Sequence, residues 1–201
     1  MDEQRAKRNT KTRGKIKAAL TELMVEKGFD AITVSDITRR AGINRGTFYL
    51  HFVDKYDALD QLEDEVIGEL EEILLRPAHE DGEQTRHVDL FPYPVILEAV
   101  QYVTGDFAFV SAISGKGGDQ DFSRKLKRII FDLLDQGLAR AGAKLVVPEP
   151  FDADYAREIC ISHVMAILDL WLARGGVEPA EQVARMVCDA KDIAPQSLVR
   201  L

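Results

Sequence analysis

The chain has 201 residues, of which 46% are hydrophobic and 30% are charged. This balance excludes a wholly disordered chain and is typical of a soluble globular protein of one or two domains. No run of 18 apolar residues occurs and the N-terminus is polar and basic, so the sequence predicts neither a membrane span nor a secretory signal. Cys160 and Cys188 lie in apolar helical patterns and are expected to be reduced thiols of a cytoplasmic protein.

The charge is divided unevenly along the chain, although its net value is −8. Residues 1–57 contain 12 Lys/Arg and 8 Asp/Glu, a net of +4, whereas residues 58–201 contain 14 and 26, a net of −12. A basic module joined to an acidic body suggests binding to a nucleic acid, although a solvated basic tail would give the same count. The negative net charge therefore does not exclude a DNA-binding protein.

Helical periodicity dominates the N-terminal part of the chain. Apolar residues recur at steps of three and four, which places them on one face of a helix. Glycine is a common helix stop, and Ser, Asn and Asp are common caps. These signals predict a helix at 10–27 that ends at Gly28, followed by a short helix capped by Ser35 and ended by Gly42. A second short helix is predicted at 47–52 with Asn44 as its cap, and a long helix is predicted from Asp54 to about residue 75.

The same periodicity continues to the C-terminus between segments rich in Gly, Pro and charge. The predicted loops are 76–92, 115–121 and 146–152, and the predicted helices are 94–104, 106–114, 122–142, 152–173 and 178–191. The apolar segment 106–114 fits a strand or a helix, and its helical neighbours favour a helix. The sequence therefore predicts an all-α fold of about nine helices, with a three-helix head at 1–56 and a helical bundle at 57–201.

Residues 33–55 (TVSDITRRAGINRGTFYLHFVDK) contain two short helices joined by a tight turn at Gly42. Glycine adopts the positive φ that such a turn needs. This arrangement is typical of a helix-turn-helix, whose second helix enters the major groove of DNA. The residues expected to be exposed suit that role. Arg45 can reach a guanine or a phosphate, Gly46 allows the backbone to approach DNA closely, and Thr47 offers a hydroxyl and a methyl group. Tyr49 and His51 can donate hydrogen bonds to phosphate, and Lys55 can neutralise a phosphate charge.

The segment from Thr12 to Leu59 resembles the DNA-binding domain of the TetR/AcrR family of bacterial regulators, through KGFDAITVSDIT, AGINRGTFYLHF and DKYDAL. It departs from the family at Thr38, where a small Ala is usual. The resemblance implies a homodimer whose interface is formed by the last two long helices, here about 152–173 and 178–191. It also implies a body that encloses a pocket for a small effector, whose binding moves the long fourth helix and releases DNA.

The resemblance also implies which residues face DNA. Lys55 would clamp a phosphate, and the basic residues Arg8, Lys11 and Arg13 would add phosphate or minor-groove contacts. The remaining DNA-facing residues would be Thr33, Ser35, Asn44, Arg45, Gly46, Thr47, Tyr49 and His51.

Signals in the body are less specific. Five residues are candidates for an effector cavity, although each also fits a plain core role: Tyr102, Phe107, Phe131, His163 and Trp171. Cys160 and His163 share a helix face, and His79 and His87 lie in an acidic loop, but no set of metal ligands is evident. The GKGG at 115–118 lacks the pattern of a phosphate-binding loop. We therefore expect no metal, no cofactor and no enzymatic activity.

These observations together predict a transcriptional regulator. Its expected partners are a pseudo-palindromic double-stranded DNA operator, a small-molecule effector and a second copy of the chain, with no membrane partner. We expect a repressor that the effector releases from DNA. Two alternatives stay open: an activator of the same family, and a ligand-binding helical body with a vestigial DNA head, which the acidic body suggests.

Overall fold

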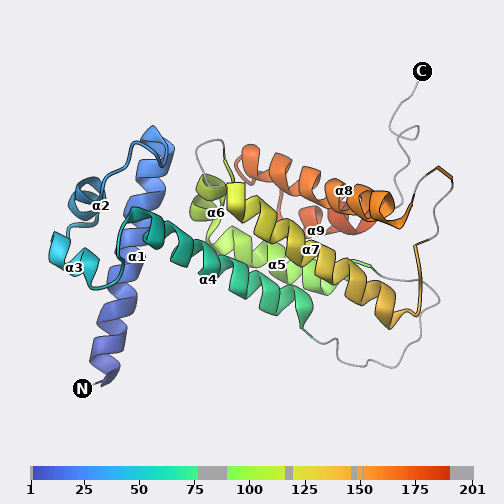
Figure 1. The fold of residues 1–201 in the computed structure, drawn as a ribbon, viewed down its shortest axis with the longest axis horizontal. Helices are drawn as coiled ribbons and strands as arrows, with labels where there is room; N and C mark the ends of the chain where they lie inside the picture. Colours follow the sequence, from blue (N-terminus) through green and yellow to red (C-terminus); the bar gives the residue numbers. More distant parts are fainter. Residues whose placement is uncertain (1, 77–89, 116–119, 146–148, 151, 191–201) are drawn as a thin grey trace. The chain divides into compact units, whose positions relative to one another are not determined.

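The computed structural model describes residues 2–76, 90–115, 120–145, 149–150 and 152–190 (Figure 1). These residues form helices and no strand, which confirms the predicted all-α fold. The helices of the described residues are α1 (Asp2–Lys27), α2 (Val34–Ala41), α3 (Arg45–Tyr49), α4 (Lys55–Leu75), α5 (Tyr93–Gly105), α6 (Phe107–Ser114), α7 (Gln120–Arg140), α8 (Ala153–Ala173) and α9 (Ala180–Asp189). The predicted loop histidines, His79 and His87, lie outside the described residues.

The helices divide into two compact units. The first unit contains α1, α2, α3, α6, α4 up to Ile67 and α7 up to Phe122. The second unit contains α5, α8, α9 and the remainders of α4 and α7. The sequence predicts a different boundary, between residues 56 and 57, which separates a DNA-binding head from an effector-binding body. The two compact units do not test this functional boundary, so it stays a prediction.

In the first unit, α2 packs against both α1 and α3, as Figure 1 shows at the blue end of the chain. Helix α1 begins at Asp2 rather than near residue 10, where the apolar pattern starts. The earlier residues include Glu, Gln, Arg, Ala and Lys, which are good helix formers without an apolar stripe. The largest fully buried side chains of this unit are Ile16, Leu20, Ile32, Ile37, Phe48, Phe52, Leu59, Leu62, Phe109, Ile113 and Phe122.

Helix α6 also packs on α1, although many residues separate the two in sequence. The ammonium group of Lys17 donates to Asp106 and lies 4.5 Å from the centre of the Phe109 ring. Asp106 occupies the N-cap position of α6, yet its side chain makes no capping hydrogen bond. The carboxylate is used for the ion pair with α1, so α6 belongs to the same unit as the N-terminal helices.

In the second unit, α9 packs against α5 and α8. The turn between α8 and α9 contains Gly175 and Gly176, with φ of 79° and 67°, which confirms the predicted helix stop. Trp171 is buried, and its indole N–H donates to the carbonyl of Glu178 at 3.0 Å. This bond fixes the turn, and Pro179 is the N-cap residue of α9, which begins at Ala180, two residues after the predicted start at 178.

Over the described parts of the chain, no single helix is both long enough and apolar enough to cross a membrane.

Candidate nucleic-acid interface

The N-terminus of α2 is fixed by a capping box. The Thr33 hydroxyl accepts from the N–H of Asp36 at 3.2 Å, and the Asp36 carboxylate accepts from the N–H of Thr33 at 3.0 Å. The expectation that Ser35 caps this helix is therefore wrong, because the acid that completes the box lies three residues after Thr33. Hydrogen bonds from Lys27 and Thr33 hold the pKa of Asp36 far below its usual range.

The turn between α2 and α3 follows the predicted geometry. Gly42 has φ of 63°, and Ile43 N–H donates back to the Thr38 carbonyl at 3.0 Å. Thr38, the residue that departs from the family pattern, is buried, and its hydroxyl donates to the Ser35 carbonyl at 3.2 Å. The extra polar group is thus satisfied inside α2 and leaves the helix-turn-helix intact.

Helix α3 begins earlier and ends earlier than the predicted helix at 47–52. Asn44 caps it as predicted, with its side-chain oxygen accepting from the Thr47 N–H at 2.7 Å. The cap directly precedes Arg45, so the helix starts there and ends at Tyr49. Phe48 and Phe52 are buried with their ring centres 5.7 Å apart. They hold α3 on the core and leave its other face exposed.

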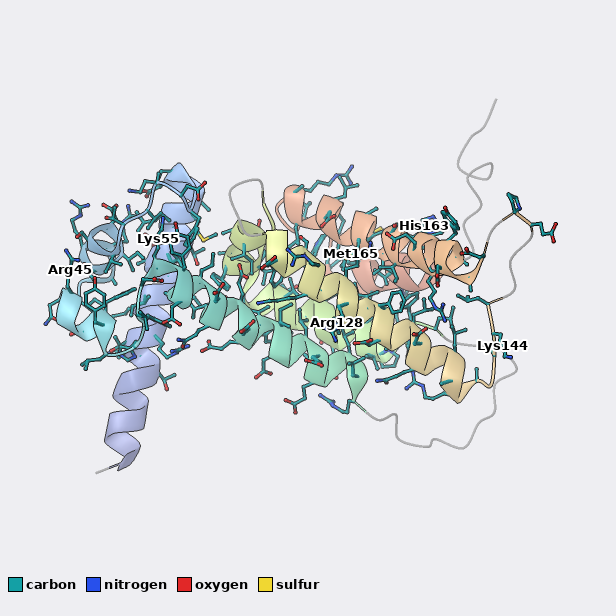
Figure 2. All side chains as sticks on the ribbon, viewed as in Figure 1. Arg45, Lys55, Arg128, Lys144, His163 and Met165 are labelled. Atoms are coloured by element: carbon teal, nitrogen blue, oxygen red, sulfur yellow. The ribbon has the colours of Figure 1, made fainter. Side chains whose placement is uncertain are left out.

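Three of the predicted DNA-facing residues come together across α2 and α3. The Arg45 guanidinium donates to the Ser35 hydroxyl at 3.3 Å and to the Tyr49 hydroxyl at 3.2 Å. It also lies 5.9 Å from the centre of the Tyr49 ring. All three side chains are exposed, and Figure 2 labels Arg45 on α3. We call this group of Ser35, Arg45 and Tyr49 the Arg45 cluster.

Other predicted residues of the interface have structural partners. The Thr33 hydroxyl is part of the capping box, and the Thr47 hydroxyl donates to the Asn44 side-chain oxygen at 3.0 Å. A Cβ atom at Gly46 would lie 3.3 Å from that same oxygen. Glycine at position 46 therefore protects the cap of α3, in addition to any close approach that it allows to DNA.

Lys55 lies at the N-terminal end of α4 (Figure 2) and is tied to the chain that follows α1. Its ammonium group donates to the carbonyls of Phe29 and Asp30, at 3.1 and 3.0 Å. It also lies 4.8 and 4.9 Å from the ring centres of Phe29 and Tyr56. An ammonium group has three N–H donors, so these two bonds leave one for a phosphate. The phosphate role stays a prediction.

His51 is partly buried next to Phe52. Burial, and secondarily the charge of Arg13, lower the pKa of its imidazole below the usual value. A lowered pKa favours the neutral imidazole, which still has one N–H to donate.

Arg13 is partly buried, unlike the exposed Lys11 two positions before it. Its guanidinium donates to Gln61 at 3.1 Å and to Glu65, and it lies 4.6 Å from the Phe52 ring. These contacts join α1 to α4 and to the end of the helix-turn-helix. Lys11 is exposed on α1, and Arg8 lies in the same helix. Nothing in the sequence distinguishes the partly buried Arg13 from the exposed Lys11.

The five residues proposed for an effector cavity have different environments. Tyr102, Phe107 and Phe131 are partly buried, His163 is exposed on α8, and Trp171 is buried. Phe131 lies 5.9 Å from the guanidinium of Arg157. Trp171 has the structural bond described above, and the effector role of all five stays a prediction. Within the described residues, no three His, Cys, Asp or Glu side chains form a group that could hold a metal ion.

Comparisons with known proteins point to one class of regulator. A family model described as bacterial regulatory proteins, tetR family, matches residues 16–62. The chain is 24% identical to the fatty acid metabolism regulator protein of Bacillus subtilis over 159 residues, which cover 77% of this chain and 80% of that protein. It is 32% identical to the HTH-type transcriptional repressor BepR of Brucella suis over 77 residues, 38% of this chain and 37% of that one.

Solved structures share the fold over most of the chain. The fatty acid degradation regulator FadR from Bacillus halodurans matches 89% of this chain and 93% of its own, with a TM-score of 0.63 and 18% identity. A TetR-family transcriptional regulator from Syntrophomonas wolfei matches 96% of this chain and 98% of its own, with a TM-score of 0.62 and 20% identity.

Proposed function

Because the chain belongs to the TetR family of bacterial DNA-binding transcriptional regulators, we propose that it represses transcription from a pseudo-palindromic operator. It binds this operator as a homodimer and leaves it when a small-molecule effector binds the body at 57–201. The Arg45 cluster is the main observation that supports operator binding. It places a guanidinium, two hydroxyls and an aromatic ring on the exposed side of the helix-turn-helix.

The chemistry of this cluster fits contact with a major groove. A guanidinium reads guanine through two parallel hydrogen bonds, whereas hydroxyl groups serve mainly as phosphate donors. In the free protein, Ser35 and Tyr49 hold the Arg45 side chain and so reduce the entropy that it loses on DNA. Thr33, Asn44 and Thr47 support the cluster through the two caps, and Lys55 and His51 supply flanking phosphate contacts.

The exposed face of α8 supports the homodimer. Tyr155, Ile159 and Leu170 are 62%, 47% and 52% exposed, and their spacing puts them on one side of the helix together with the small residues Ser162 and Ala166. Exposed apolar side chains gathered on one face mark protein contact sites. We propose that two α8 helices pair through this face, with the exposed charged residues of α9 at the rim.

Arg45→Ala should weaken binding to the specific operator by about 1–3 kcal/mol, because a base-reading arginine loses its hydrogen bonds to guanine. Tyr49→Phe, which removes one hydroxyl that positions Arg45, should have a smaller effect in the same direction. The operator can be selected from a pool of random duplexes, and gel shifts at fixed salt would measure the affinities. Arg39→Ala is the matched control, since Arg39 is an exposed arginine of α2 outside the cluster. Equal affinities of Arg45→Ala and wild type would contradict the role of the cluster.

The two alternative functions are separated by different measurements. A reporter gene behind the selected operator distinguishes repression from activation, because the sign depends on where the operator lies relative to the promoter. Binding mapped across the genome tests the vestigial-head alternative. Discrete peaks at promoters would refute that alternative, whereas their absence would favour it over the proposed repressor.

A second proposal concerns the class of effector and rests on the relative that matches 159 residues. So long a match extends beyond the first 67 residues, so it includes body residues as well as the head. That relative is named for fatty acid metabolism, and the aligned solved structure is named for fatty acid degradation. We therefore propose that the chain regulates genes of fatty acid metabolism and takes a fatty acyl compound as its effector.

Palmitate or palmitoyl-coenzyme A is expected to raise the melting temperature of the dimer and to weaken operator binding. A ligand at about 100 times its dissociation constant stabilises the protein that it binds by about 2.7 kcal/mol. Differential scanning fluorimetry and gel shifts would measure the two effects, with butyrate as the short-chain control. If neither palmitate nor palmitoyl-coenzyme A changes the melting temperature or the operator affinity, the proposal of a fatty acyl effector is wrong. That result would not contradict the proposal that the chain binds an operator.

A further inference from the structure

The end of α3 carries an exposed apolar side chain on the same unit as the Arg45 cluster. Leu50 is 83% exposed, although both aromatic residues that flank it at positions 48 and 52 are buried. A single exposed leucine is ordinary on a protein surface. This one is notable for its place, because it lies directly after the helix that carries the predicted DNA contacts.

The backbone shows that Leu50 continues the last turn of α3. Its φ and ψ are −75° and −16°, and its N–H donates to the carbonyl of Gly46 at 3.2 Å. Residues four apart lie on the same face of a helix, so Leu50 shares a face with Gly46. Glycine adds no side chain to that face, which leaves Leu50 as the bulky apolar group there.

The exposed side chains of Arg45, Tyr49 and Leu50, on α3 and at its C-cap, differ in their chemistry. Arg45 and Tyr49 are also four residues apart and present hydrogen-bond donors. Leu50 has no polar atom, so in a major groove it would contact an apolar part of a base. The C5-methyl group of thymine is the apolar group that the major groove displays.

We propose that Leu50 reads a thymine of the operator through its C5-methyl group. The inference rests on the proposed function, since it needs α3 in the major groove. It adds a specificity-determining residue beside the Arg45 cluster, and it assigns the exposed Leu50 side chain to DNA rather than to a protein partner.

The test compares wild type and Leu50→Ala on operators in which each thymine in turn is replaced by deoxyuridine, which lacks only the methyl group. Wild type should lose affinity about 3- to 5-fold at one thymine in each half-site, the effect expected for burying about one methyl group. Leu50→Ala should bind the thymine operator more weakly than wild type and should be insensitive to deoxyuridine at that position. The full-length protein is used throughout.

Val25→Ala is the control, because Val25 is also a largely exposed apolar residue, 75% exposed, and lies on α1 outside the helix-turn-helix. This variant should keep both the wild-type affinity and the wild-type sensitivity to deoxyuridine. The proposal is overturned if deoxyuridine has the same effect on wild type and on Leu50→Ala, or if no thymine matters to wild type. A wild-type chain that selects no duplex at all overturns the proposed function as well, so the two failures are distinguishable.

Discussion

An Ile159→Glu variant is expected to be a monomer at concentrations where the wild-type chain is a dimer. Ile159 lies on the α8 face that also exposes Tyr155 and Leu170. In an isologous pairing every changed residue occurs twice, so the two glutamates would lie near each other in an apolar seam. Burying unpaired charge is costly, and like charges at close range add repulsion. Sedimentation equilibrium would measure the change in mass.

The same variant should lose operator affinity although the helix-turn-helix is unchanged. A dimer contacts two half-sites, and the second contact is made at a high effective concentration that typically raises affinity 10²- to 10⁴-fold. We expect a loss of about this size in gel shifts. Val25→Glu places the same charge on a more exposed apolar residue of α1 and should leave the dimer intact. A dimeric Ile159→Glu variant with normal operator affinity would show that α8 is not the seam.

The helix-turn-helix could be predicted from sequence because its signals are local. Gly42 and Asn44 have the positions that the turn and the cap of α3 require, and the structure confirms both. The sequence alone favours Ser35 as the cap of α2, because serine is a good cap in isolation. Thr33 takes that role because only its partner, Asp36, completes the capping box. The signal for this cap is therefore the pair of Thr33 and Asp36, and the preference of a single residue is weaker.

The long-range contacts could not be predicted, because no local pattern encodes them. Arg13 and Lys55 are basic residues beside the helix-turn-helix, so the resemblance implies a phosphate contact for Lys55 and a phosphate or minor-groove contact for Arg13. The structure places the Arg13 guanidinium on Glu65 and the Lys55 ammonium on two backbone carbonyls. Similarly, the ion pair between Lys17 and Asp106 joins residues far apart in sequence. A basic residue near a DNA-binding motif can thus be bound to another part of the protein. Only the tertiary structure shows which basic residues have such a partner.

Replacing Phe48 with alanine should destabilise the first unit by about 3–5 kcal/mol, the usual cost of truncating a buried phenylalanine. Phe48 is 0% exposed and packs on the rings of Tyr49 and Phe52, with ring centres 5.6 and 5.7 Å away. Whole domains are stable by only about 5–15 kcal/mol. Much of this free energy of unfolding would be lost. Helix α3 would also lose its attachment to the core, and with it the positions of Arg45 and Tyr49. Urea unfolding followed by far-UV circular dichroism would measure the loss.

The single tryptophan makes it possible to locate this destabilisation. Trp171 is buried in the second unit, so its fluorescence reports on that unit, whereas circular dichroism reports on all helices. In Phe48→Ala, the dichroism transition should begin at lower urea while the fluorescence midpoint moves less, because the cavity lies in the first unit. Phe48→Leu keeps most of the buried volume and should cost much less. Coincident shifts of both signals would instead mean that the two units unfold as one cooperative body. Loss of the core around Phe48 would then also weaken the α8 face on which the proposed dimer depends.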